Sequence, residues 1–208
     1  MDGGAWAGPG APHRAARGAR IGPNAILQLV PVLDRACGPV MRGRLLAAGG
    51  FDDVPSAEAM IDEGAVACVH QALRSALPAQ AAALGWAAGT RTGDYIRINR
   101  IPRPAQALLR ALPTALSKPL LAKAIAKHAW TFAGSGRFAI ISSRPLTLEI
   151  SDNPVVRGET AAAPVCDWHA AVFERLFRAL VDPALRCREV ACCAIGAPAC
   201  RFVIDRPE

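Results

Sequence analysis

Hydrophobic residues recur at helical spacing over much of the first two thirds of the chain. The clearest case follows Ser56, where apolar side chains stand near every 3.6 residues until Pro78 ends the pattern. Spacing of this kind places the apolar side chains on one face of a helix. A helix is therefore predicted to begin at Ser56 and to bury one side against the rest of the protein.

Further helices are expected on the same grounds. Asn24 is a suitable N-cap for residues 25–37, in which Pro31 is expected to cause a kink. Gly38-Pro39 is expected to end this helix, because proline lacks the amide hydrogen that a helix interior needs. The remaining helices are predicted over residues 79–97, 105–112 and 118–132.

Three glycines stand four residues apart in the helix predicted over residues 79–97. They are Gly85, Gly89 and Gly93. Because glycine has no Cβ, one face of this helix is bare. We expect another backbone or a flat ligand to approach closely there.

The pattern changes to strands in the last third of the chain. Residues 137–143 and 146–151 are rich in alternating or β-branched apolar residues, with Arg144-Pro145 between them. A helix is predicted over residues 165–181, and a second hairpin over residues 185–195 and 200–204.

These elements predict an α+β fold in a single domain over residues 23–208. A helical N-terminal half packs on a small antiparallel sheet, which consists of two hairpins around a C-terminal helix. Residues 1–22 are expected to be a disordered tail, because their glycines, prolines and arginines do not support regular structure.

Composition narrows the class of protein. The chain has 208 residues and a formal net charge of +7, but no run of five or more basic residues, so nucleic acid is not an expected partner. No segment reaches about 18 apolar residues without charge, and the first twenty residues lack a secretory apolar region. The expected location is the cytoplasm, with the basic helices offering a peripheral contact to an anionic membrane surface.

Seven cysteines in such a chain point to thiols or metal ligands rather than disulfides. Cys166, Glu189, Cys192 and Cys200 offer three sulfurs and one carboxylate, a set that suits a tetrahedral zinc ion. Residues i and i+3 of a regular strand face opposite ways, so Glu189 and Cys192 can converge only at a bulge or a strand end. Two alternatives stay open: Cys193 takes the place of Cys192, or these cysteines are small buried hydrophobic residues.

The same region resembles the vinyl-4-reductase domain family. The resemblance lies in residues 166–177, 188–196 and 200–204, and residues 135–205 are its most characteristic part. In phenol-sensing regulators that carry this domain, the zinc ligands follow the order Cys, Glu-x-x-Cys, Cys. The resemblance therefore implies that Cys166, Glu189, Cys192 and Cys200 hold a structural zinc ion.

The resemblance also implies a function. It is sharpest to the members that act in bacteriochlorophyll synthesis, and it implies a magnesium tetrapyrrole as the ligand, enclosed in an apolar pocket between the helices and the sheet. A pathway enzyme is then the partner, and a homodimer is expected.

The residues themselves contain neither a G-x-G-x-x-G motif after a strand nor a P-loop, so no NAD or flavin site is recognised. Since reduction of a vinyl group needs a hydride donor, the chemistry favours a carrier that presents the intermediate to another enzyme. A vinyl reductase of protochlorophyllide-type substrates and a small-molecule sensor are the alternatives.

Six residues are candidates for ligand contact. His70 and His128 offer an imidazole nitrogen to magnesium, Lys123 and Lys127 offer cations to carboxylates, and Trp86 and Trp130 offer rings for stacking. For each of them, packing in the core or exposure on a solvated face is the alternative interpretation.

Overall fold

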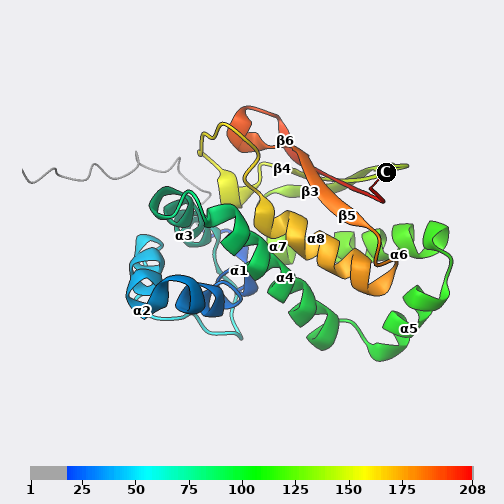
Figure 1. Ribbon diagram of the computed structural model, residues 1–208, viewed down its shortest axis with the longest axis horizontal. Coiled ribbons are helices and arrows are strands. Elements are labelled where there is room, and N and C mark those ends of the chain that lie inside the picture. Colours follow the sequence, from blue (N-terminus) through cyan, green and yellow to red (C-terminus); the bar gives the residue numbers. More distant parts are fainter. Residues whose placement is uncertain (1–17, 208) are drawn as a thin grey trace, which may run out of the picture.

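The computed structural model describes residues 18–207. Its first half is helical and contains two short strands: β1 (Arg20–Ile21) pairs with β2 (Ile61–Asp62) in an antiparallel register. The helices of this half are α1 (Asn24–Leu27), α2 (Val30–Ala48), α3 (Glu63–Ala76), α4 (Ala81–Asn99), α5 (Arg103–Ala111), α6 (Thr114–Lys127) and α7 (Trp130–Ala133). Figure 1 shows α4 crossing the molecule and leading into α5 and α6 at one end.

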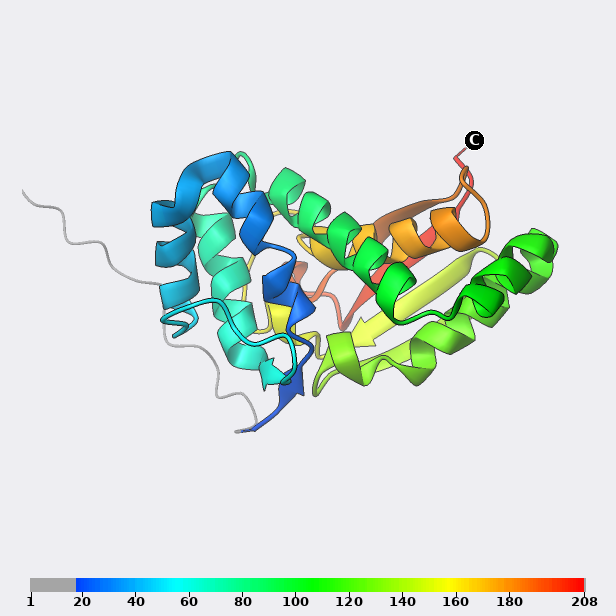
Figure 2. The same cartoon turned by 90° about the horizontal axis from the view of Figure 1, so that it is seen from below.

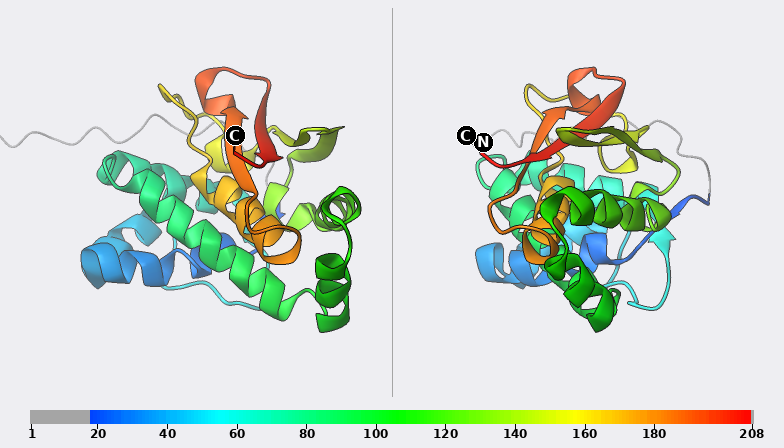
Figure 3. Two further views of the ribbon diagram at one scale, coloured as in Figure 1. Left: turned by 45° about the vertical axis from the view of Figure 1, so that its right-hand side comes forward. Right: turned by 90° about the vertical axis from the view of Figure 1, so that its right-hand side faces the viewer.

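The second half forms one antiparallel sheet in the order β3-β4-β6-β5. Its elements are β3 (Arg137–Ser143), β4 (Leu146–Ser151), the 3-10 turn η1 (Pro154–Val156), α8 (Asp167–Leu180), β5 (Arg186–Ala191), the 3-10 turn η2 (Cys193–Ile195) and β6 (Ala199–Asp205). Figure 3 shows α8 between α4 and this sheet, and in Figure 2 α6 lies alongside β3. The predicted α+β class and both predicted hairpins are confirmed.

Two predicted starting points differ from the structure, and one predicted end agrees with it. Ile21 is fully buried in β1, so the folded domain begins before residue 23; residues 1–17 of the predicted tail lie outside the described residues. The predicted end of a helix at Gly38-Pro39 is confirmed, because Gly38 leaves the helical conformation with a φ of 79° and Pro39 then starts a new helical segment within α2. The helix predicted from Ser56 begins only at Glu63.

The late start of α3 has a local cause. The side chain of Asp62 accepts a hydrogen bond from the Ala65 amide at 2.9 Å, which makes Asp62 the N-cap. Ser56 instead accepts a hydrogen bond from the Glu58 amide within a turn. The residues between α2 and β2 are therefore a connection that brings β2 beside β1.

The bare glycine face of α4 is occupied by the backbone of α8. A Cβ atom on Gly89 would lie 2.3 Å from the carbonyl oxygen of Trp168 and 2.7 Å from the Cβ of Ala171. One turn further along, a Cβ on Gly93 would lie 2.7 Å from the Cβ of Arg175. The sequence predicted that either another backbone or a flat ligand would approach this face, and the structure has a second helix there.

Among the described residues, no helix combines the length and the apolar character needed to cross a membrane.

The close contact of α4 and α8 gives a first prediction. Gly89→Ala should destabilise the protein by about 1–3 kcal/mol, because the new methyl group overlaps a backbone carbonyl that the helix cannot move alone. Denaturant unfolding measures the change. Gly43→Ala is the matched control: Gly43 lies in α2, where an added Cβ would meet no atom within 4 Å, so it should be neutral or stabilising by up to about 1 kcal/mol. Equal effects of the two substitutions would contradict the close packing.

Candidate metal centre and exposed helical face

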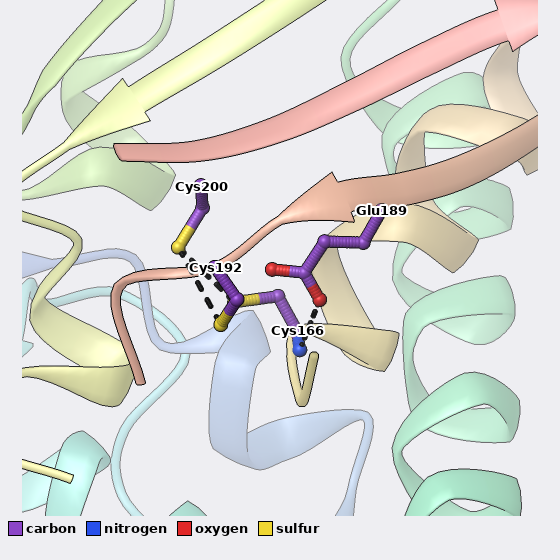
Figure 4. A group of neighbouring side chains, drawn as sticks. All are labelled: Cys166, Glu189, Cys192 and Cys200. Atoms are coloured by element: carbon purple, nitrogen blue, oxygen red, sulfur yellow. Dashed lines mark hydrogen bonds between the residues drawn. The ribbon is translucent and has the colours of Figure 1, made fainter. Parts of the chain in front are cut away.

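The structure brings together the four residues proposed as metal ligands. Cys166 is the N-cap of α8, Glu189 lies on β5, Cys192 follows the end of β5, and Cys200 lies on β6. Figure 4 shows their side chains pointing toward one another, and their ligand atoms all lie within 4.8 Å of one another.

The separations of the three sulfurs match a tetrahedral ion. The Sγ of Cys166 lies 3.5 Å from that of Cys200 and 3.8 Å from that of Cys192, and the latter two are 3.9 Å apart. Two zinc–sulfur bonds of about 2.3 Å at a tetrahedral angle put their sulfurs about 3.8 Å apart. The three thiols therefore stand at the corners that a zinc ion requires.

An irregularity in the sheet lets Glu189 and Cys192 converge. The pairing of β5 with β6 changes register between Glu189 and Ala191, and Cys192 stands beyond the last residue of β5. A bulge and a strand end are the two features expected to let side chains three residues apart converge. Cys192, and not Cys193, belongs to the group of four.

Two nitrogen donors stabilise negative charge on the sulfurs. Asn153, which is 1 % exposed, donates from Nδ2 to the Sγ of Cys166 at 3.4 Å and to that of Cys200 at 3.5 Å. The amide of Cys193 donates to Cys200 Sγ at 3.4 Å. Hydrogen bonds from nitrogen favour a thiolate over a thiol. Sequence reasoning missed Asn153, which stands in the connection before η1 with no motif to mark it.

Glu189 presents an oxygen with no protein partner among the described residues. Its Oε2 accepts a hydrogen bond from the Cys166 amide at 2.8 Å, whereas its Oε1 is buried without any hydrogen bond. Burial raises the pKa of this carboxyl group to about 8. A buried carboxylate oxygen of this kind is costly unless it binds a cation.

The thiols share this electrostatic problem. Hydrogen bonds from Cys166 and Cys200 lower the pKa of Cys192, while hydrogen bonds with Cys166 and Cys192 raise the pKa of Cys200. One thiolate is thus stabilised by two neutral thiols. The donor set fits a divalent cation, since three soft sulfurs and one hard oxygen suit zinc, and zinc would permit all three sulfurs to be thiolates.

The sequence predicted an enclosed pocket between the helices and the sheet, and aromatic side chains occupy much of this region. The aromatic rings of Phe132, Phe138, Phe173 and Phe202 pack against one another between α7, α8 and the sheet, with ring centroids 5.2–6.1 Å apart along the series. The nearby cavity lined by His70 and His169 measures about 10 Å³, which is room for about one water molecule. The space around these four rings is therefore filled by side chains, and a tetrapyrrole enclosed there would have to displace them.

The six candidate ligand residues lie in different parts of the structure. His70 is 2 % exposed and its Nε2 lies 3.1 Å from the Ala25 carbonyl oxygen, so it serves the core. Trp86 is exposed and lies on α4. The other four candidates, Lys123, Lys127, His128 and Trp130, are all exposed along α6 and at the start of α7.

Two leucines share one face of α6 with the two lysines. Leu116, Leu120, Lys123 and Lys127 follow one another at intervals of four, three and four residues, which places them on one face of α6. Leu116 is 58 % exposed and Leu120 is 43 % exposed. We name these four residues, together with His128 and Trp130, the α6–α7 face. Sequence reasoning missed its apolar part, because leucines at helical spacing are typical of a buried side.

The family model of the vinyl-4-reductase domain matches residues 146–206 of this chain. The match contains all four members of the metal group, so the fold and the site define a protein of the vinyl-4-reductase domain class. Among solved structures, H-NOX proteins share the fold: one from K. algicida, in the unliganded Fe(II) form, has a TM-score of 0.58 at 9 % identity over 90 % of this chain and 97 % of its own. Another, from S. oneidensis, has a TM-score of 0.51 at 12 % identity over 90 % of this chain and 100 % of its own.

Two relatives are much more similar in sequence. The bacteriochlorophyll synthase 23 kDa chain of Cereibacter sphaeroides is 57 % identical over 88 % of this chain and 89 % of the relative. The protein of the same name from Rhodobacter capsulatus is 50 % identical over 89 % of this chain and 86 % of the relative. The chain belongs to this family, and the resemblance inferred from the sequence is confirmed.

The buried histidine next to the small cavity gives a prediction for pH. Burial lowers the pKa of His70 from 6.5 to about 3. Between these values the unfolded chain binds a proton that the folded protein does not. The free energy of unfolding should therefore fall as the pH is lowered below 6.5, with His70 contributing about 1.4 kcal/mol per pH unit.

Urea unfolding between about pH 7 and about pH 5 measures this contribution. His70→Gln should remove it from the pH dependence, whereas His128→Gln, at an exposed position, should retain the wild-type slope. A wild-type slope in His70→Gln would show that His70 is not buried as a neutral group.

Proposed function

We propose that this protein is an accessory chain of bacteriochlorophyll biosynthesis that holds a magnesium tetrapyrrole and presents it to a pathway enzyme. The observation that carries the pathway is the 57 % identity to a chain named for bacteriochlorophyll synthase. The aromatic packing between the helices and the sheet directs the ligand to the surface, and the α6–α7 face has the chemistry that such a ligand needs. No motif for a hydride-donating cofactor supports the reductase alternative. The sensor alternative rests on similarity to H-NOX proteins, and this similarity concerns the fold alone.

Each part of a magnesium tetrapyrrole has a counterpart on the α6–α7 face. The apolar macrocycle is flat, and Trp130 and Leu120 offer exposed apolar surface to it. Its carboxylates suit the ammonium groups of Lys123 and Lys127, and the imidazole of His128 suits the magnesium ion. An open face also leaves one side of the bound molecule available to the receiving enzyme.

The metal centre has a structural part in this proposal. Cys166, Glu189, Cys192 and Cys200 would hold zinc with four protein ligands, and an ion closed in this way supplies stability rather than reactivity. The ion would tie the start of α8 to strands β5 and β6. The helix that supports the aromatic core is then fixed at its first turn.

The α6–α7 face also supports peripheral membrane contact. Exposed leucines and lysines on one face of α6, followed by an exposed tryptophan at the start of α7, are the composition of segments that lie on anionic lipid. The protein would then receive its ligand where an apolar pigment intermediate partitions. The homodimer expected from the family stays a prediction.

Pigment binding can be tested by titration. Purified protein is titrated with magnesium protoporphyrin, and binding is measured by tryptophan quenching and the shift of the visible absorption band, with and without anionic vesicles. Lys123→Glu with Lys127→Glu should weaken binding by about tenfold or more, because each lost charge-assisted contact is worth about 1.5–3 kcal/mol. His128→Ala should weaken the magnesium form and leave the metal-free porphyrin unaffected.

Trp86→Ala is the matched control for Trp130→Ala, since both tryptophans are exposed and only Trp130 belongs to the α6–α7 face. Binding that survives every change on this face would contradict the proposed site. Loss of the vinyl absorption upon addition of NADPH would instead support the reductase.

The metal proposal has an independent test. Elemental analysis of purified protein should find about one zinc per chain. Cys192→Ser and Cys200→Ser should lose the metal and lower the unfolding midpoint. Cys187→Ser is the control, because Cys187 is a buried thiol on β5 outside the group of four. A metal-free wild-type protein whose stability does not change when zinc is added would remove this hypothesis.

A further inference from the structure

A basic groove separates the end of α4 from α5. It has a volume of about 390 Å³ and is lined by Arg97, Ile98, Arg103, Gln106, Ala107 and Arg110. That volume lies within the range of small-molecule sites. None of these residues belongs to the metal centre or to the α6–α7 face. We propose that the groove binds a small amphipathic molecule that carries a carboxylate or phosphate group.

The charge of the groove is positive and poorly neutralised. Its lining contains three arginines and no acidic residue. Arg103 is exposed and makes no side-chain hydrogen bond or ion pair with any residue that the structure describes. Guanidinium groups bind carboxylate and phosphate through paired hydrogen bonds, so the lining suits an oxyanion.

Arg97 adds a donor that lacks an acceptor among the described residues. Its Nε is buried without a hydrogen-bond partner. Its Nη2 reaches Asp94 Oδ1 only at 3.4 Å, while the same oxygen accepts a shorter bond of 2.7 Å from Arg175. The carboxylate of Asp94 is thus committed mainly to Arg175, and the guanidinium of Arg97 retains binding capacity for an anion.

Gln106 holds the two sides of the groove in place. It is 7 % exposed and donates from Nε2 to the carbonyl oxygens of Arg97 at 2.6 Å and Ile101 at 2.8 Å. Its Oε1 accepts from Arg110, whose Nε donates to the Ala179 carbonyl oxygen on α8 at 3.1 Å. The arginines therefore stand on a fixed frame, which reduces the entropy lost when a ligand binds.

An exposed apolar side chain at the rim of the groove suggests that the ligand has an apolar part as well as an anionic one. Ile98 is 64 % exposed and lines the groove beside Ala107. Covering Ile98 removes apolar surface from water, which a bare inorganic anion cannot do. The groove thus suits an anion attached to a short apolar group better than an anion alone.

Calorimetric titration with octyl phosphate and with octanoate tests the proposal and distinguishes the two headgroups. At least one should bind, more tightly than inorganic phosphate and more tightly than uncharged octanol. Arg103→Ala should weaken binding by about tenfold, the value of one charge-assisted contact, and Arg103→Lys should fall between this variant and the wild type.

Arg91→Ala is the matched control, because Arg91 is an exposed arginine of α4 that does not line the groove. It should bind as the wild type does. Equal losses in Arg91→Ala and Arg103→Ala, or octanol binding as tightly as both anions, would overturn the site, as would failure of both anions to bind. Since Arg103 has no partner among the described residues, an unchanged unfolding midpoint separates lost binding from lost structure.

Discussion

The contact between the backbones of α4 and α8 determines where the rest of the structure can lie. Gly89 leaves no room for a side chain against the carbonyl oxygen of Trp168, so the two helices touch along their length. The indole Nε1 of Trp168 then donates to the buried hydroxyl of Thr92 at 3.2 Å, which fixes the rotation of α8 as well as its distance. The aromatic residues on the other side of α8 are thereby presented to the sheet. Cys166, at the first turn of α8, is held where β5 and β6 can reach it.

A second set of polar contacts fixes the connection between β4 and α8. Arg74 of α3 pairs with Glu159 and donates to the carbonyl oxygens of Val155 and Val165. This arginine joins the helical half to the segment that carries Asn153 and leads into Cys166. The metal centre therefore depends on α3 as well as on the strands. Binding of a metal ion there would require that both halves of the protein are folded.

The sequence predicted most of the helices and the four-stranded sheet, and missed β1, β2 and the apolar part of the α6–α7 face. Strands β3 and β4 could be predicted because β-branched residues flank a turn at Arg144-Pro145. The four metal residues could be predicted because their order resembles the zinc ligands of the same domain in phenol-sensing regulators; their types and spacing alone left Cys193 and small buried thiols as alternatives. Asn153 could not, since its two hydrogen bonds to sulfur arise from a fold contact that leaves no local pattern. The aromatic packing could not be predicted for a related reason. The spacing of Phe132, Phe138 and Phe173 does not reveal that their rings pack together between helix and sheet.

The filled core changes how a protein of this fold can handle a large apolar ligand. An enclosed ligand would have to displace the packed rings around Phe173, and such rearrangement forfeits the dispersion contacts that hold α8 to the sheet. A ligand on the exposed α6–α7 face needs no rearrangement and gains apolar contact from Leu116 and Leu120, which already lie in water. Binding at the face would therefore leave the packed rings around Phe173 in place, as the proposed carrier role requires.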